Sequence, residues 1–271
     1  MPNSYRLLAF LLIAVVALPV GAQDHISPND DWCENDHWTR NDDGDFARAC
    51  EVRTFTLAVR DQFTVDAGNY GGVSVEAWDR DAVQLRARIN VNTRVESEAR
   101  RLVDAITIET DGTITSRVPR TGNDTWATVS FRLMVPRQTD LDLTAENGGI
   151  SVEGVDGRIR FQTVNGGVSL VDLAGDVEGR TVNGGLSVTL NGSGWNGEGL
   201  DVETTNGGLS LTIPPNYSAD LETGTINGSL RLDFPVTVQG DLRRHLRTTL
   251  GRGGRLIRAV TTNGGAIIER G

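Results

Sequence analysis

A short motif, Asn-Gly-Gly, returns through the C-terminal half of the chain and constrains the fold more than any other feature. It occurs at Asn147, Asn165, Asn183, Asn206 and Asn263, and the related Asn-Gly-Ser occurs at Asn227. Successive intervals are 18, 18, 23, 21 and 36 residues, so the last is twice the first. A fixed period indicates an array of similar units that bury their apolar faces against one another.

Apolar residues keep fixed places around each Asn. The positions three and five residues after it hold Ile150 and Val152, Val168 and Leu170, Leu186 and Val188, Leu209 and Leu211, Leu230 and Leu232, and Ala266 and Ile268. In four units a serine lies between the two, and in five a threonine lies two residues before the Asn. Alternation of this kind is typical of strands with one buried face, so a strand enters and leaves each corner.

Each 18-residue unit therefore holds two short strands and two turns. This length fits one coil of a flattened β-solenoid with two sheet faces. A meander of hairpins is the alternative, because Asn-Gly is also the strongest hairpin signal. The solenoid is favoured because alternate turns differ chemically. We expect an all-β protein whose residues 144–271 form a β-solenoid-like repeat.

The motif itself has a structural explanation. Corners need left-handed backbone, which Gly tolerates freely and Asn better than other residues. Stacked Asn side chains also hydrogen-bond along a ladder. We therefore interpret the six Asn residues as a structural turn ladder, with Asn165 in the left-handed conformation at an internal corner.

Residues 55–143 show apolar and polar alternation in several short runs, which predicts a small antiparallel sheet. One stretch, residues 95–104, places Ala99, Leu102 and Val103 at helical spacing. We expect an N-terminal β region with one short helix near these residues.

The first 22 residues have the pattern of a secretory signal peptide: Arg6, an apolar run, and small residues before a cut after Ala22. Residues 23–54 form an acidic arm with Cys33 and Cys50, the only cysteines. An exported chain with two cysteines predicts one disulfide between them, which holds the arm in place. A metal site with His37 lacks a fourth ligand, and a calcium loop at residues 41–45 lacks the EF-hand spacing.

The chain has 26 basic and 36 acidic side chains, a net charge of −10, which argues against a nucleic-acid partner. One basic island stands out: Arg243, Arg244, Arg247, Arg252, Arg255 and Arg258. It is either a surface for an anionic glycan or lipid headgroup, or a group of solvated or internally paired charges. Trp195, in a five-residue insertion of the repeat, either stacks on a sugar or covers an open sheet edge.

The sequence gives little support for a catalytic site. The only histidines are His25, His37 and His245, and two of them fall in the acidic arm, which leaves little basis for a catalytic triad. A polysaccharide-cleaving enzyme would need paired carboxylates, for which the candidates are Asp172, Asp176, Glu178, Asp201 and Glu203. Outward charge also serves solubility, so we expect no catalytic residue, no metal and no cofactor.

Several segments together resemble a bacterial family of β-strand-repeat proteins of unknown function that carries the name "putative adhesin". They are the leader, Cys50-Glu51-Val52-Arg53, the helix and strand over residues 98–108, Val135-Pro136, the Thr-x-Asn-Gly ladder, Ile213-Pro214, and residues 251–254 with 262–265. The likeness covers residues 55–271. It implies an exported, non-enzymatic all-β module that binds or scaffolds in the cell envelope or outside the cell. The sequence does not identify the partner; the candidates are a glycan, an envelope component and another protein. The alternative function is a polysaccharide-cleaving, carbohydrate-active enzyme on the same architecture.

Overall fold

The computed structural model describes residues 23–27, 31–34, 47–122, 124–233 and 244–271. The leader (1–22), His37, the stretch 41–45 and Arg243 lie outside these residues. The elements up to the repeat are β1 Gln23–Ser27, α1 Asp31–Glu34, β2 Ala47–Leu57, β3 Gln62–Asp66, β4 Val73–Trp78, β5 Val83–Thr93, α2 Glu96–Ala105, β6 Thr107–Glu109, β7 Thr113–Arg117 and β8 Trp126–Pro136. The protein is all-β, as predicted.

The repeat region follows with strands alone among the described residues. They are β9 Asp140–Ala145, β10 Ile150–Glu153, β11 Asp156–Asn165, β12 Val168–Val171, β13 Ala174–Asn183, β14 Leu186–Thr189, β15 Gly197–Asn206, β16 Leu209–Ile213, β17 Ala219–Asn227, β18 Leu230–Leu232, β19 His245–Leu250, β20 Leu256–Asn263 and β21 Ala266–Arg270.

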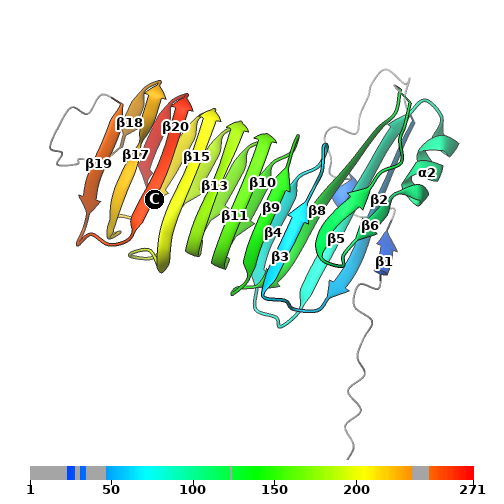
Figure 1. The fold of residues 1–271 in the computed structure, drawn as a ribbon, viewed down its shortest axis with the longest axis horizontal. Coiled ribbons are helices and arrows are strands. Elements are labelled where there is room, and N and C mark those ends of the chain that lie inside the picture. The colour runs from blue at the N-terminus through cyan, green and yellow to red at the C-terminus, as the bar shows by residue number, and fades with distance from the viewer. Residues whose placement is uncertain (1–22, 28–30, 35–46, 123, 234–243) are drawn as a thin grey trace, which may run out of the picture.

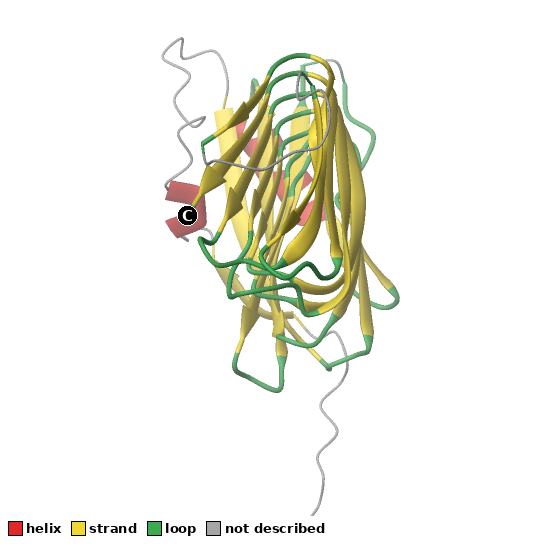
Figure 2. Ribbon diagram, turned by 90° about the vertical axis from the view of Figure 1, so that its left-hand side faces the viewer, coloured by secondary structure: helices red, strands yellow, loops and turns green. Residues whose placement is uncertain are grey.

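All of these strands form two large mixed sheets that face each other. Sheet A has the order β1-β2-β5-β8-β4-β10-β12-β14-β16-β21-β18, and sheet B has the order β19-β17-β20-β15-β13-β11-β9-β3-β7-β6. The strands stack side by side along the long axis of the molecule (Figure 1), and the view turned by 90° shows the two layers (Figure 2). One continuous apolar core fills the space between them, from Phe55 to Ile268.

From β9 to β16, successive strands alternate between the two sheets. Each strand pairs in parallel with the strand one repeat later: Ile150 lies opposite Val168, and Val168 lies opposite Leu186. The strands on either side of an Asn-Gly corner therefore belong to different sheets. The alternative of a hairpin meander is wrong, because a hairpin would pair those two strands with each other.

The Thr-x-Asn-Gly sequence is explained by how closely the corners stack. The buried hydroxyl of Thr163 donates to the carbonyl oxygen of Gly148 in the preceding coil, at 2.8 Å, and Thr181 does the same to Gly166 at 2.8 Å. A Cβ on Gly166 would lie 2.0 Å from that same Gly148 oxygen. Only glycine therefore allows the carbonyl to approach, and the threonine satisfies it where water has no access.

The Asn side chains form the hydrogen-bonded ladder along one edge. Asn165 Nδ2 donates to Asn147 Oδ1 at 2.7 Å, and Asn183 Nδ2 donates to Asn165 Oδ1 at 2.8 Å. The predicted left-handed backbone at Asn165 is wrong: Asp172 is the non-glycine residue with positive φ among those described. The corner selects Asn for its side-chain amide, which is both donor and acceptor, and not for its backbone freedom.

The ladder contains one coil that its spacing does not reveal. Residues 69–76 read Asn-Tyr-Gly-Gly-Val-Ser-Val-Glu, and residues 147–153 read Asn-Gly-Gly-Ile-Ser-Val-Glu. β4 pairs with β10 with Ser74 opposite Ser151, and Asn147 Nδ2 donates to the backbone oxygen of Asn69 at 2.7 Å. β3 and β4 are therefore the first coil of the ladder, inside the region predicted as a separate N-terminal sheet.

The coils do not stack in chain order at the other end. β20 lies between β15 and β17, and β21 lies between β16 and β18. Asn263 accordingly donates to Asn206, and Asn227 donates to Asn263. The coil formed by residues 256–271 is thus inserted between two coils that precede it in the sequence.

The N-terminal strands and α2 cover the first coil. α2 begins one residue after the start of the predicted range and ends one residue after its end. It buries Ala99 and Val103 against β2 and β5. Arg53, 8% exposed, donates to the backbone oxygens of Val103 and Ile106 at the end of the helix, at 2.8 and 2.5 Å. A cation at a helix C-terminus satisfies its open carbonyls, which anchors α2 to sheet A.

Candidate binding surface

The outer face of sheet A carries a trough with a floor of serines. Strand register aligns one outward position from each coil: Ser74, Ser151, Ser169, Ser187 and Ser210. A cavity of about 790 Å³ follows these serines, and glycines from the Asn-Gly-Gly corners form one side of it. Because neighbouring strands are ~4.8 Å apart, the floor presents a hydroxyl at each step along the molecule.

Larger side chains close both ends of this trough. At one end Ser74 lies opposite Arg132, and at the other Ser210 lies opposite Ile267, which is 39% exposed. Trp32 also lines the trough, with the guanidinium of Arg132 4.4 Å and that of Arg88 5.0 Å from its ring centre. The trough therefore runs from an aromatic and cationic end to an aliphatic end.

The disulfide fixes the element that carries Trp32. Cys33 in α1 and Cys50 in β2 are bonded, with their Cα atoms 5.9 Å apart, which confirms the predicted pairing. The bond ties α1 to sheet A next to the cationic end of the trough. Its position gives the acidic arm a role that the sequence did not indicate, namely to hold an indole ring at the candidate surface.

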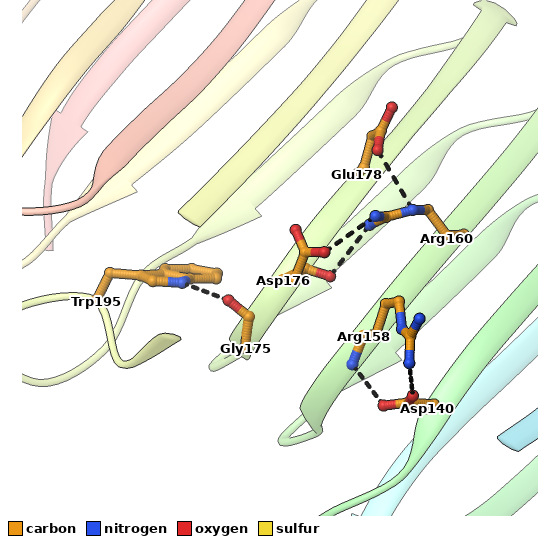
Figure 3. A network of polar contacts seen from close by, with 7 residues as sticks. All are labelled: Asp140, Arg158, Arg160, Gly175, Asp176, Glu178 and Trp195. Atoms are coloured by element: carbon orange, nitrogen blue, oxygen red, sulfur yellow. Dashed lines mark hydrogen bonds and ion pairs between the residues drawn. The ribbon is translucent and has the colours of Figure 1, made fainter. Parts of the chain in front are cut away.

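The outer face of sheet B is a charged surface of a different character. Arg160 pairs with Asp176 at 3.0 Å and with Glu178 at 3.3 Å, and Arg158 pairs with Asp140 at 3.0 Å (Figure 3). These arginines and carboxylates come from neighbouring coils, so opposite charges alternate across the strands. Cross-strand pairs of this kind stabilise a sheet modestly and keep its face soluble.

Three of the six arginines of the basic island form ion pairs of the same kind on sheet B. Arg258 lies 2.5 Å from Asp201 and 3.8 Å from Glu203, and Arg247 and Arg255 pair with Glu222 and Glu198. Burial alone would lower the pKa of Arg258, but its hydrogen bond to Asp201 and the nearby carboxylates outweigh this and raise it. Arg244 donates to the backbone oxygen of Ile226, and Arg252 is exposed. Arg247, Arg255 and Arg258 are therefore balanced by carboxylates from other parts of sheet B.

The candidate catalytic carboxylates are the partners of these arginines. Asp176 and Glu178 bind Arg160, Asp201 and Glu203 bind Arg258, and Asp172 lies 3.4 Å from Arg137. His245 is at the far edge of sheet B, 3.8 Å from Glu222. The geometry therefore places all five of these carboxylates in ion pairs with arginines.

Trp195 packs on the core. Its indole Nε1 donates to the backbone oxygen of Gly175 at 3.0 Å (Figure 3), and its ring is partly buried against the apolar cluster. The insertion that carries Trp195 thus covers the sheet between β13 and β15. Both β13 and β15 are internal strands of sheet B.

Two contributors to the candidate surface were missed from the sequence. The serine column was visible in four units, but its extension to Ser74 needed the alignment of residues 69–76 with 147–153 across a one-residue insertion. Trp32 gave no signal, because its place depends on a disulfide between segments that the periodicity does not cover.

The described residues hold neither a metal-binding cluster nor a membrane-spanning helix. No group of three or more His, Cys, Asp and Glu side chains is arranged to hold a metal ion. Neither of the helices in the described ranges is long and apolar enough to cross a membrane.

No protein-family model and no curated protein matches the chain. Among solved structures, it is similar to a putative cell adhesion protein from Clostridium sporogenes (TM-score 0.39, 8% identity, 81% of this chain and 100% of that chain). It is also similar to putative adhesins from Bacteroides fragilis (TM-score 0.29, 10% identity, 81% and 96%) and Parabacteroides merdae (TM-score 0.31, 9% identity, 80% and 95%). Two of these three descriptions carry the name adhesin.

Proposed function

We propose that the protein is an exported, non-enzymatic binding module, adhesin-like, that acts in the cell envelope or outside the cell. In this proposal residues 144–271, together with the first coil, form a β-solenoid scaffold. The trough on sheet A is the surface that receives the partner, an extended glycan strand. The observation that carries the proposal is the serine column, since it repeats a hydroxyl at a spacing close to the length of one sugar residue in an extended chain.

Export is supported by the disulfide and by the predicted leader. A Cys33–Cys50 bond persists in an oxidising compartment and is rare in the cytosol. The leader pattern of residues 1–22 predicts the same route. A mass measurement on protein recovered from the periplasm or medium tests both, since it detects a chain starting at Gln23 and two hydrogens fewer than the dithiol form.

A binding role is favoured over glycan cleavage by the contacts of the candidate carboxylates. Glycoside hydrolysis needs one carboxyl group protonated as an acid and another free as a base or nucleophile. On sheet B the candidates instead lie in ion pairs, Asp176 and Glu178 with Arg160, and Asp201 and Glu203 with Arg258. The floor of the trough offers hydroxyls and backbone, which bind without reacting.

Glycan-array binding by the chain from Gln23 to Gly271 tests the proposal. We expect wild-type protein to retain at least one extended glycan, and Ser169→Arg, which fills the middle of the trough, to abolish that retention. Thr205→Arg is the matched control, because it adds the same exposed charge on sheet B. Equal retention by wild type and Ser169→Arg, or no retention of any glycan, would contradict a glycan-binding trough.

A further inference from the structure

A second cavity, of about 520 Å³, opens beside the corner of the first coil. Two aromatic rings line it and are exposed to solvent: Tyr70 is 58% and Trp126 51% exposed. Among the described residues no other Trp, Tyr or Phe is comparably exposed. Large exposed aromatic rings that share one cavity are a feature of ligand sites more than of ordinary surface.

Tyr70 is present because of an insertion that the corner itself does not need. At the six later corners Asn is followed directly by Gly, whereas Tyr70 lies between Asn69 and Gly71. Its backbone is held on both sides: its oxygen accepts from the N–H of Val129 at 3.1 Å, and residue 70 forms a parallel bridge with Asn147. The backbone that carries the Tyr70 ring is therefore fixed. The corner does not need this aromatic residue, because the six later corners form without one.

The remaining wall of this cavity is polar but uncharged. Its side chains with hydrogen-bonding groups, apart from the two rings, are Asn69, Ser116, Thr121, Thr125 and Thr128. Within the described part of the chain no charged residue lines it, although 23% of the whole sequence is charged. A charged ligand would lose hydration here without a compensating partner. A pyranose ring suits the cavity, because its C–H face packs on an aromatic ring while its hydroxyls exchange hydrogen bonds with amide and hydroxyl groups.

We propose that this cavity is a binding site for one neutral sugar ring, with Tyr70 and Trp126 as its stacking platforms. The site rests on observations separate from the serine trough, since none of its lining residues lines the trough. Rigid aromatic rings provide contact area at low entropic cost, so they carry much of the binding free energy of small sites.

Saturation-transfer NMR and titration of the chain from Gln23 to Gly271 test the site with four neutral probes: maltohexaose, cellohexaose, laminarihexaose and chitohexaose. We expect at least one of them to bind and hexagalacturonate to bind more weakly. Tyr70→Ala and Trp126→Ala should each weaken binding about tenfold or more, whereas Tyr70→Phe, which keeps the ring, should stay within about twofold. Ile226→Ala is the matched control, because Ile226 is 63% exposed and lies outside the cavity.

Ser169→Arg separates this site from the trough. Binding that is lost in Tyr70→Ala but kept in Ser169→Arg supports the corner site whatever the outcome for the trough. Binding that is lost in Ser169→Arg but kept in Tyr70→Ala overturns the corner site and assigns the sugar to the trough. The inference is also overturned if no neutral probe binds, or if Tyr70→Ala and Ile226→Ala behave alike. Melting temperatures of all variants exclude loss of binding through unfolding.

Discussion

At the scale of the residue, the two glycines of the corner after Asn183 have different constraints. A Cβ on the first, Gly184, would lie 2.0 Å from the backbone oxygen of Gly166, while a Cβ on the second, Gly185, would lie 3.7 Å from the oxygen of Gly208. Neither glycine has positive φ. The first glycine is therefore required by the close approach of two coils, and the second is not required by local sterics.

This difference predicts opposite outcomes for two neighbouring substitutions. We expect Gly184→Ala to destabilise the protein by about 2–4 kcal/mol, because the clash is with backbone and must move a whole coil. Gly185→Ala should change stability by less than about 1 kcal/mol, and reduced chain entropy in the unfolded state favours the alanine. Urea unfolding of both variants measures the difference, and equal losses would show that the coils do not stack as described.

Tyr217 gives the molecule a specific sensitivity to alkaline pH. It is 4% exposed, and burial raises its pKa from 10.0 to about 12. Below pH 10 the phenol is neutral in both the folded and the unfolded chain, so it adds no pH dependence. Between pH 10 and 12 the unfolded chain loses this proton and the folded chain keeps it, so stability falls with rising pH, by up to about 2 kcal/mol.

The test of this effect is unusually clean because the chain has no lysine and three tyrosines. Tyr217→Phe should flatten the stability profile between pH 10 and 12 in chemical unfolding experiments. Tyr70→Phe is the control, since it makes the same substitution at an exposed tyrosine. A wild-type profile that is already flat in this range would contradict the burial effect.

At the scale of the element, a large side chain on one strand is compensated by a small residue at the paired position of the next strand. Phe161 on β11 and Gly179 on β13 occupy the same inward position in register, and a Cβ on Gly179 would lie 2.4 Å from the Phe161 ring. The glycine thus makes room for the aromatic ring of the coil beside it. Such large and small pairs fill a core at constant volume.

The pair should couple in a double-mutant cycle. We expect Gly179→Ala to cost about 1–3 kcal/mol by overpacking and Phe161→Leu to cost about 1 kcal/mol by loss of contact. The double variant should cost clearly less than the sum, because the shorter side chain gives space to the new methyl group. Additive losses, measured by thermal or urea unfolding, would show that the two side chains do not share one space.

Sequence periodicity was a good guide to elements where each residue faces the same environment in every coil. The apolar columns and the Thr-x-Asn-Gly corners are set by repeated local contacts, so one unit resembles the next and the all-β class follows. α2 was visible for the same reason, since Ala99 and Val103 pack at helical spacing. The left-handed Asn was wrong because spacing does not distinguish a backbone need from a side-chain ladder.

The candidate surfaces were less accessible to prediction than the strands. The serine column was readable as outward positions, but whether those positions lie in a depression depends on Trp32 and Ile267 at its ends. The net charge of the basic island, counted along the sequence, did not predict its surroundings in the fold. Arg255 and Arg258 contact carboxylates that are 57 residues away in the sequence. Tyr70 was hidden by the insertion that makes it distinctive.

At the scale of the whole molecule, the insertion of residues 256–271 between earlier coils has consequences for assembly. β20 bonds to β15 on one side and to β17 on the other, and β21 bonds to β16 and β18. Among the described strands, β17 and β18 therefore pair with the rest of the ladder through this segment. Short β18 and antiparallel β19 then close the far edges of the two sheets, which limits edge-to-edge association.

Removal of residues 256–271 should open four strand edges at once, those of β15, β16, β17 and β18. We expect the shortened chain to melt well below the full chain and to self-associate, because exposed edges in the middle of a stack are templates for pairing.

A synthetic peptide of residues 256–271 added in trans should restore the monomer, as measured by light scattering and thermal melting. The matched peptide with Gly264→Val should fail, because Gly264 has φ +151° and a Cβ there would lie 2.1 Å from the oxygen of Gly207. A shortened chain that stays monomeric with an unchanged melting temperature would contradict the inserted position of this coil.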